Sequence, residues 1–177
     1  MQQQGIAATG GRTDGAARGV MAGAPAGAAH AGAEDAAAEV YLTLTVAETM
    51  CGVPVLAVRD VLTTQAITRI PLAPPEVAGS LNLRGRIVTA VDLRRRLGLP
   101  PRVTGTAGMS VVVERDGELY SLLVDQVGDV VPLPRAGRAP KPPTLDPLWR
   151  DVAADVHRMD DRLVILLDVE RVLAIGA

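Results

Sequence analysis

Residues 109–125 read MSVVVERDGELYSLLVD, in which two runs rich in branched aliphatic side chains flank Asp116 and Gly117. An Asp-Gly pair is a strong hairpin signal, because both central residues of a two-residue type I′ turn need positive φ. Valine and leucine suit the pleated, half-buried surface of a strand. The stretch therefore predicts a β-hairpin with strands at 109–114 and 118–125.

The same pattern continues outward from this hairpin. Further strands are expected at 41–46, 51–58, 86–91, 127–133, 151–157 and 162–167. A helical turn is expected at 59–62, a short helix between Asp92 as N-cap and Gly98 as terminator, another at 168–174, and Pro-rich loops at 71–75 and 134–147. Eight to ten short strands without alternating long helices indicate an antiparallel all-β barrel or sandwich.

Composition divides the chain and limits its function. Residues 1–39 are mostly Ala and Gly and are predicted to be a disordered tail, whereas 40–177 carry the domain. The formal net charge of −2 gives no general attraction to nucleic acid. The single cysteine, Cys51, excludes an intrachain disulfide framework and fits a reducing compartment, and no apolar run is long enough to span a bilayer.

Catalytic and metal-ligating patterns are not found. His30 lies in the tail, His157 lies in a predicted strand, and neither accompanies a nucleophile or a zinc-ligand spacing. We therefore expect no catalysis, no metal and no cofactor. The basic run Arg94 to Arg96 is interpreted as a solvated helix face, and Trp149 as a packing anchor.

One polar segment stands out: residues 80–86, SLNLRGR, between a Pro-rich loop and an aliphatic strand. Arg84 carries a planar fork of donors that suits the carboxylates or carbonyls of a partner. From the residues alone, a structural clamp and an interaction site are equally good interpretations.

This segment is also where the chain resembles the CheW family of chemotaxis coupling proteins and the related regulatory domain of CheA kinases. The resemblance covers residue 40 to the C-terminus in the family's order. It rests on 41–44 (YLTL), 51–55 (CGVPV), 58–62 (VRDVL), 68–71 (TRIP), 77–79 (VAG), 82–88 (NLRGRIV), 91–94 (VDLR), 123–127 (LVDQV) and 166–168 (LLD). The sequence departs from the family's pattern at three places. Thr89-Ala90 replaces the usual Pro-Val/Ile, Asp60 replaces the commoner Glu, and Leu122 stands where the family often has a small Gly.

The resemblance implies two interlocked five-stranded SH3-like β-barrels with short helices, and a non-enzymatic adaptor. Its partners would be the cytoplasmic tips of methyl-accepting chemoreceptors and a CheA-type histidine kinase, in the cytoplasm at membrane-associated receptor arrays. Receptor binding carries over to Arg84, Asp60, Asn82, Gly85 and Gly79, while the kinase contacts cannot be assigned to residues.

Two alternatives stay open. The first keeps the adaptor fold but places it in another receptor-linked pathway, such as pilus motility or development. The second, of a different class, is a small β-barrel enzyme or ligand-binding protein, which would need a pocket with perturbed titratable groups.

Overall fold

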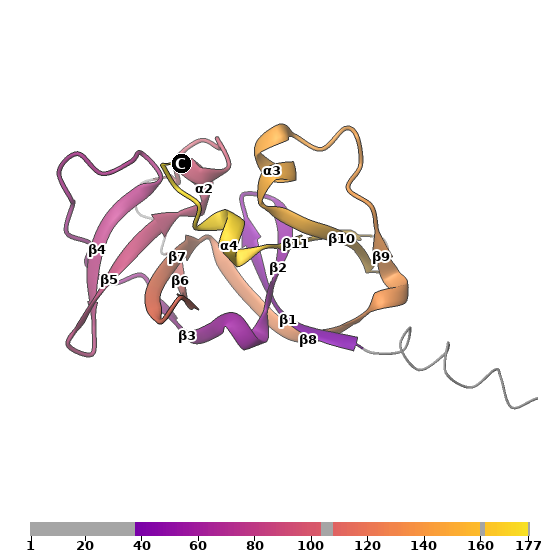
Figure 1. Ribbon diagram of the computed structural model, residues 1–177, viewed down its shortest axis with the longest axis horizontal. Coiled ribbons are helices and arrows are strands. Elements are labelled where there is room, and N and C mark those ends of the chain that lie inside the picture. The colour runs from indigo at the N-terminus through magenta and orange to yellow at the C-terminus, as the bar shows by residue number, and fades with distance from the viewer. Residues whose placement is uncertain (1–37, 104–107, 160–161, 177) are drawn as a thin grey trace, which may run out of the picture.

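The computed structural model describes residues 38–103, 108–159 and 162–176, which form two curled β-sheets lying side by side with short helices near their junction (Figure 1). The elements in chain order are β1 (Ala38–Val46), β2 (Thr49–Pro54), η1 (Val55–Ala57), β3 (Val58–Thr63), β4 (Val77–Leu83), β5 (Arg86–Asp92), α2 (Leu93–Arg96), β6 (Met109–Arg115), β7 (Glu118–Val124), β8 (Gln126–Pro134), η2 (Arg135–Gly137), β9 (Arg138–Ala139), α3 (Pro147–Val152), β10 (Ala153–Met159), β11 (Arg162–Leu167) and α4 (Val169–Val172).

The two sheets are interlocked by the path of the chain. The six-stranded sheet has the order β8-β1-β2-β11-β10-β9, so it takes strands from both ends of the domain, while the five-stranded sheet, β3-β6-β7-β5-β4, comes from the middle. The predicted all-β fold is confirmed, but it is not purely antiparallel as expected, because β2 pairs with β11 and β5 pairs with β7 in parallel. The first sheet has one strand more than expected because the two-residue β9 pairs with β10.

The two sheets share one large hydrophobic cluster, and each has a smaller cluster of its own. The shared cluster joins Leu44 of β1, Val91 of β5, Leu122 of β7 and Leu167 of β11 with Trp149 of α3. Trp149 is 7% exposed, as expected of a packing anchor. Because this cluster includes strands of both sheets, the two sheets stabilise each other through shared apolar contacts.

Several local predictions are confirmed. Asp116 and Gly117 have φ of 52° and 80°, as the predicted hairpin turn requires. The Asp92 carboxylate accepts hydrogen bonds from the N–H groups of Arg94 and Arg95, and Gly98 follows the helix at φ 66°. β1 begins at Ala38, two residues before the predicted start of the domain. The predicted disordered tail otherwise lies outside the described residues.

Other local predictions were wrong. Residues 59–62 belong to strand β3, not to a helical turn. The strand pairs with β6, and its side chains alternate in burial. The helical turn comes just before, as η1. The loop expected at 134–147 is followed by a helix, α3, whose first turn is capped by the Asp146 carboxylate and begins with Pro147.

The basic run does not form a solvated face. The side chains of Arg94 and Arg96 are only 19% and 10% exposed, because they lie at the junction between the sheets. Arg94 binds the Asp125 carboxylate, with its Nη2 atom 2.8 Å from Oδ2. Arg96 binds Asp151 at 2.7 Å and donates to the Arg171 carbonyl at 3.0 Å. The run therefore joins α2 to distant segments of the chain.

None of the helices within the described ranges combines the length and the apolar character that crossing a membrane requires.

Candidate partner-binding site

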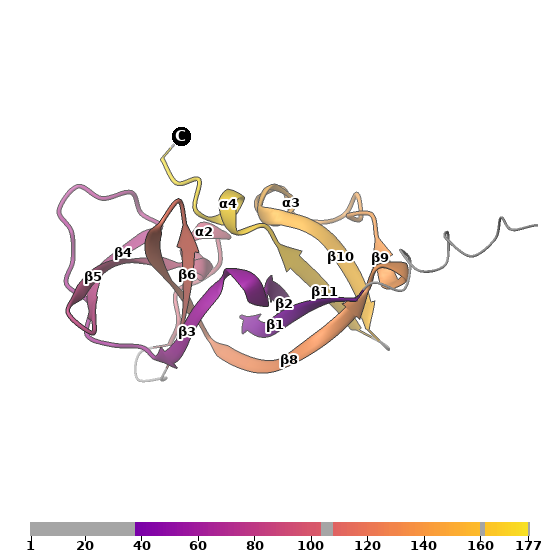
Figure 2. The same cartoon turned by 60° about the horizontal axis from the view of Figure 1, so that its bottom comes forward.

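The tip of the β4–β5 hairpin lies at the end of the molecule opposite β9 (Figures 1 and 2). Leu83 pairs with Arg86, so Arg84 and Gly85 form a two-residue turn, and both have positive φ, 52° and 87°. This is the type I′ geometry that matches strand twist. The Asn82 side chain stabilises the turn, because its Oδ1 accepts a hydrogen bond from the Gly85 N–H at 2.8 Å.

The turn presents Arg84 to solvent while an acidic group fixes one end of its guanidinium. Nη2 of Arg84 lies 3.0 Å from Oδ2 of Asp60, and the two side chains are 83% and 26% exposed. Asp60 is also held by its neighbour, since its Oδ1 accepts from the Val61 N–H at 2.9 Å. A register irregularity between Val58 and Asp60 helps to aim this carboxylate.

The Arg84–Asp60 pair connects the two edge strands of the five-stranded sheet. Asp60 is on β3 and Arg84 follows β4, which lie at opposite ends of the strand order. The pair therefore bridges the two edges of the curled sheet. An exposed ion pair adds only about 0–1 kcal/mol to stability, so the clamp contributes little by itself.

Most of the hydrogen-bonding capacity of Arg84 is left for another molecule. A guanidinium has about five N–H donors in a planar fork, and among the described residues the contact found is that of one nitrogen with Asp60. Ile87, the cross-strand neighbour of Asn82, is 75% exposed beside the turn. An oriented arginine next to an exposed aliphatic side chain is typical of binding hot spots.

The two glycines of the predicted site have different roles. A Cβ at Gly85 would meet open space, so only its positive φ restricts the residue. Gly79 is buried, has φ 147°, and a Cβ there would overlap the carbonyl oxygen of Thr68. That close approach is needed because Thr68 and Ser80 exchange two backbone hydrogen bonds of 2.8 Å.

The structure thus brings four of the five predicted residues together: Arg84, Asp60, Asn82 and Gly85. Gly79 lies near the beginning of β4, away from the turn, and holds the preceding loop against the sheet, so it acts on the site only through the backbone. Receptor contact by these residues stays a prediction.

Sequence reasoning missed a second cluster, centred on Asp125 between β7 and β8. Its carboxylate accepts hydrogen bonds from Arg94, from Arg102 Nε at 2.8 Å and from the Ala47 N–H at 2.5 Å. Burial by itself would raise the pKa of Asp125, but these hydrogen bonds outweigh it and hold the pKa below its usual range. The sequence signal that could have indicated this cluster is the single acidic residue, Asp125, directly after the apolar strand β7.

Two side chains that could act as nucleophile or base, Cys51 and His157, are buried. Burial raises the pKa of the Cys51 thiol far above its usual range, which disfavours the nucleophilic thiolate. His157 is buried, as its predicted strand position suggested, with Nε2 2.9 Å from the Pro134 carbonyl oxygen. Across the described part of the chain, no group of three or more His, Cys, Asp or Glu side chains is placed to hold a metal ion.

Comparison with known proteins agrees with this architecture. The sequence profile of a family described as the CheW-like domain matches residues 40–176. A probable chemotaxis protein CheW from Rhizobium etli is 28% identical over 118 residues, which are 67% of this chain and 76% of that protein. The chemotaxis protein CheW of Klebsiella aerogenes is 26% identical over 134 residues, which are 76% of this chain and 81% of that protein.

The crystal structure of the scaffolding protein TtCheW from Thermoanaerobacter tengcongensis superimposes with a TM-score of 0.71 at 26% identity. The match covers 78% of this chain and 94% of that one. Since the family profile spans the whole described domain and the fold agrees with that of a solved CheW protein, this chain belongs to the CheW-like domain family.

Proposed function

We propose that this protein is a chemotaxis coupling adaptor that links methyl-accepting chemoreceptors to a CheA-type histidine kinase, with Arg84 as the main receptor contact. The names of the relatives support the pathway: they are chemotaxis proteins, and one solved neighbour is called a scaffolding protein. The assignment to the receptor tip rests on the family's Asn-Leu-Arg-Gly motif, which here is Asn82 to Gly85.

The observation that carries the proposal is the presentation of Arg84. Its side chain is 83% exposed, yet the Asp60 carboxylate restrains it and the Asn82 cap fixes its backbone. Restraint lowers the entropy lost when a partner immobilises the side chain. A guanidinium held in this way is suited to a carboxylate or a carbonyl on the receptor surface.

Coupling requires a second surface for the kinase. The site near Arg84 occupies one end of the five-stranded sheet, so the strand edges of the six-stranded sheet stay accessible when a receptor is bound. Strand edges and their apolar borders are common protein-docking surfaces. In this proposal both partners bind one rigid domain, and the receptor's state reaches the kinase through geometry, without covalent chemistry.

Such a role places the protein in the cytoplasm, where it is recruited to membrane-associated receptor arrays. A reducing compartment fits the single cysteine of the sequence, Cys51, which is buried and unpaired.

The test is co-sedimentation with receptor-bearing membranes and the cognate CheA-type kinase, with receptor-controlled kinase activity measured in parallel. We expect the wild type to join the complex, and Arg84→Glu to lose receptor binding while retaining kinase binding. Arg158→Glu is the matched control, because Arg158 is exposed on β10 and has no side-chain partner among the described residues. Wild-type protein that binds neither partner would rule out the coupling function.

A further inference from the structure

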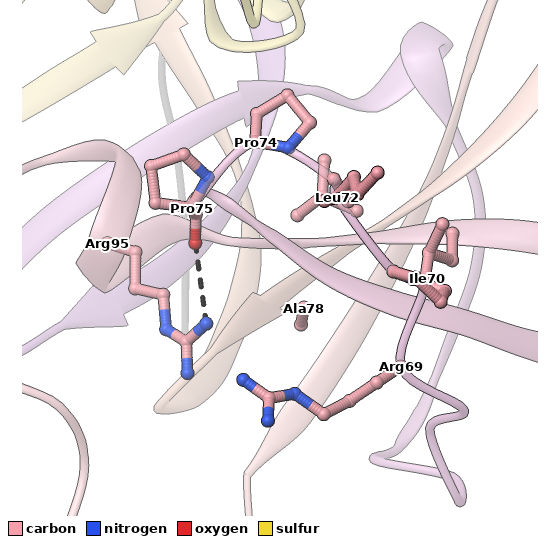
Figure 3. Close-up of a pocket in the computed structure, with 10 residues that line it drawn as sticks. Arg69, Ile70, Leu72, Pro74, Pro75, Ala78 and Arg95 are labelled. Carbon is pink, nitrogen blue, oxygen red and sulfur yellow. Dashed lines mark hydrogen bonds between the residues drawn. The ribbon is translucent and has the colours of Figure 1, made fainter.

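A pocket separate from the hairpin tip lies at the other end of β4 (Figure 3). It has a volume of about 310 Å³ and is formed by the loop at 69–75, the start of β4 and Arg95 of α2. Arg84 follows the far end of β4, after Leu83, whereas the pocket includes Val77 and Ala78 at its beginning. The two sites can therefore be tested independently.

Two arginines face this pocket from different elements. Figure 3 shows the guanidinium groups of Arg69 and Arg95 pointing toward each other, with Ala78 above the Arg69 side chain in the view. Arg95 donates to the Pro75 carbonyl at 3.3 Å, and its Nε lies 3.6 Å from Asp92 Oδ2. Arg69 has no hydrogen-bond or salt-bridge partner within 38–103, 108–159 and 162–176. Among the described residues, the lining contains these two arginines and no acidic residue, and Asp92 only partly compensates the charge of Arg95. The pocket is therefore positively charged in a protein whose net charge is −2.

The rim of the pocket is apolar and preorganised. Leu72 is fully exposed and has φ 61°, a backbone conformation that costs a leucine about 1 kcal/mol. Ile70 is also exposed, at 42%. Three prolines, Pro71, Pro74 and Pro75, restrict the loop, which lowers the entropy cost of binding. Strain that displays an aliphatic side chain to water is typical of functional positions.

We propose that this pocket docks an acidic peptide segment of a partner protein. One carboxylate of the segment would lie between the guanidinium groups of Arg69 and Arg95, and a neighbouring aliphatic side chain would pack on Leu72 and Ile70. Charge complementarity selects the carboxylate, because an anion relieves the repulsion between the two arginines and satisfies their free donors. The apolar rim selects a peptide over a bare anion.

The probe is acetyl-Leu-Glu-Leu-amide, titrated into the isotope-labelled full chain while backbone amide signals are followed by NMR. We expect saturable shifts for Leu72, Ala78 and Arg95, and a dissociation constant about tenfold larger for acetyl-Leu-Gln-Leu-amide, because one charge-assisted contact is lost. Arg69→Gln should weaken binding of the acidic peptide by about tenfold. Arg158→Gln, the matched control, should change it less than about twofold.

Two further variants separate the alternatives. Leu72→Asn keeps the left-handed backbone, which asparagine tolerates, and should weaken the acidic peptide severalfold. Arg84→Glu should bind the peptide normally, so failure of the receptor proposal would leave this one standing, and the reverse also holds. The proposal is overturned if both peptides bind equally, if the shifts map elsewhere or do not saturate, or if sodium acetate reproduces them at equal concentration.

Discussion

Replacing Asp125 by Asn should destabilise the protein by about 3 kcal/mol at neutral pH, the low end of the range for breaking a buried ion pair. The substitution removes the charge that faces Arg94 and Arg102, whose side chains are only 19% and 23% exposed. It also weakens the bond from the Ala47 N–H, which joins the β1–β2 turn to the β7–β8 junction. Urea unfolding followed by circular dichroism gives the free energy of unfolding for both proteins.

The pH dependence gives a second, independent check on Asp125. Its pKa in the folded state lies below its usual range. The stability it contributes is therefore complete above the unfolded pKa of about 3.9, and is lost as pH falls through the lower folded value. The wild type and Asp125→Asn should converge in stability in that acid range. Asp129→Asn is the matched control, since Asp129 is exposed on the adjoining strand β8. A neutral-pH difference no larger than that of the control would refute the reasoning.

Two further outcomes concern the glycines and the core. Gly79→Ala should lower the free energy of unfolding by about 2 kcal/mol or more, because a Cβ would overlap the Thr68 carbonyl. Gly85→Ala, with open space around the new Cβ, should lower it by about 1 kcal/mol. Equal unfolding midpoints for the two variants would contradict this ordering. Trp149→Ala should lower the free energy of unfolding by about 3–5 kcal/mol, because it leaves a cavity in the hydrophobic cluster shared by both sheets. A loss under about 1 kcal/mol would show that α3 is not part of that cluster.

Local patterns in the sequence were sufficient for most of the fold. The Asp116-Gly117 turn, the Asp92 cap and the aliphatic runs depend on neighbouring residues, so they could be predicted without tertiary information. β3 was misinterpreted as a helical turn because its sequence, VRDVLT, does not alternate between polar and aliphatic residues. Its alternating burial arises only from its pairing with β6.

The site was predictable only in part, for a physical reason. The Asn-Leu-Arg-Gly motif marked Arg84, but the 3.0 Å contact with Asp60 depends on the curl of a sheet that brings its two edges together. Similarly, Arg94 was taken for a solvent-facing residue, because its partner Asp125 is 31 positions away and adjacent only in the fold. Long-range charge pairing has no local signature in a single sequence.

The coupling account is tested most directly by receptor affinity in a charge-swap cycle comparing wild type, Arg84→Asp, Asp60→Arg and the double variant. If Arg84 contacts the receptor, Arg84→Asp should weaken binding by at least about 2 kcal/mol, roughly thirtyfold, and the double variant should not recover it. If the Arg84–Asp60 ion pair acts only as an internal clamp, the double variant, in which the two charges are exchanged, should bind the receptor with wild-type affinity. Such recovery would contradict the proposed role of Arg84, whereas its absence in a folded double variant would support direct contact.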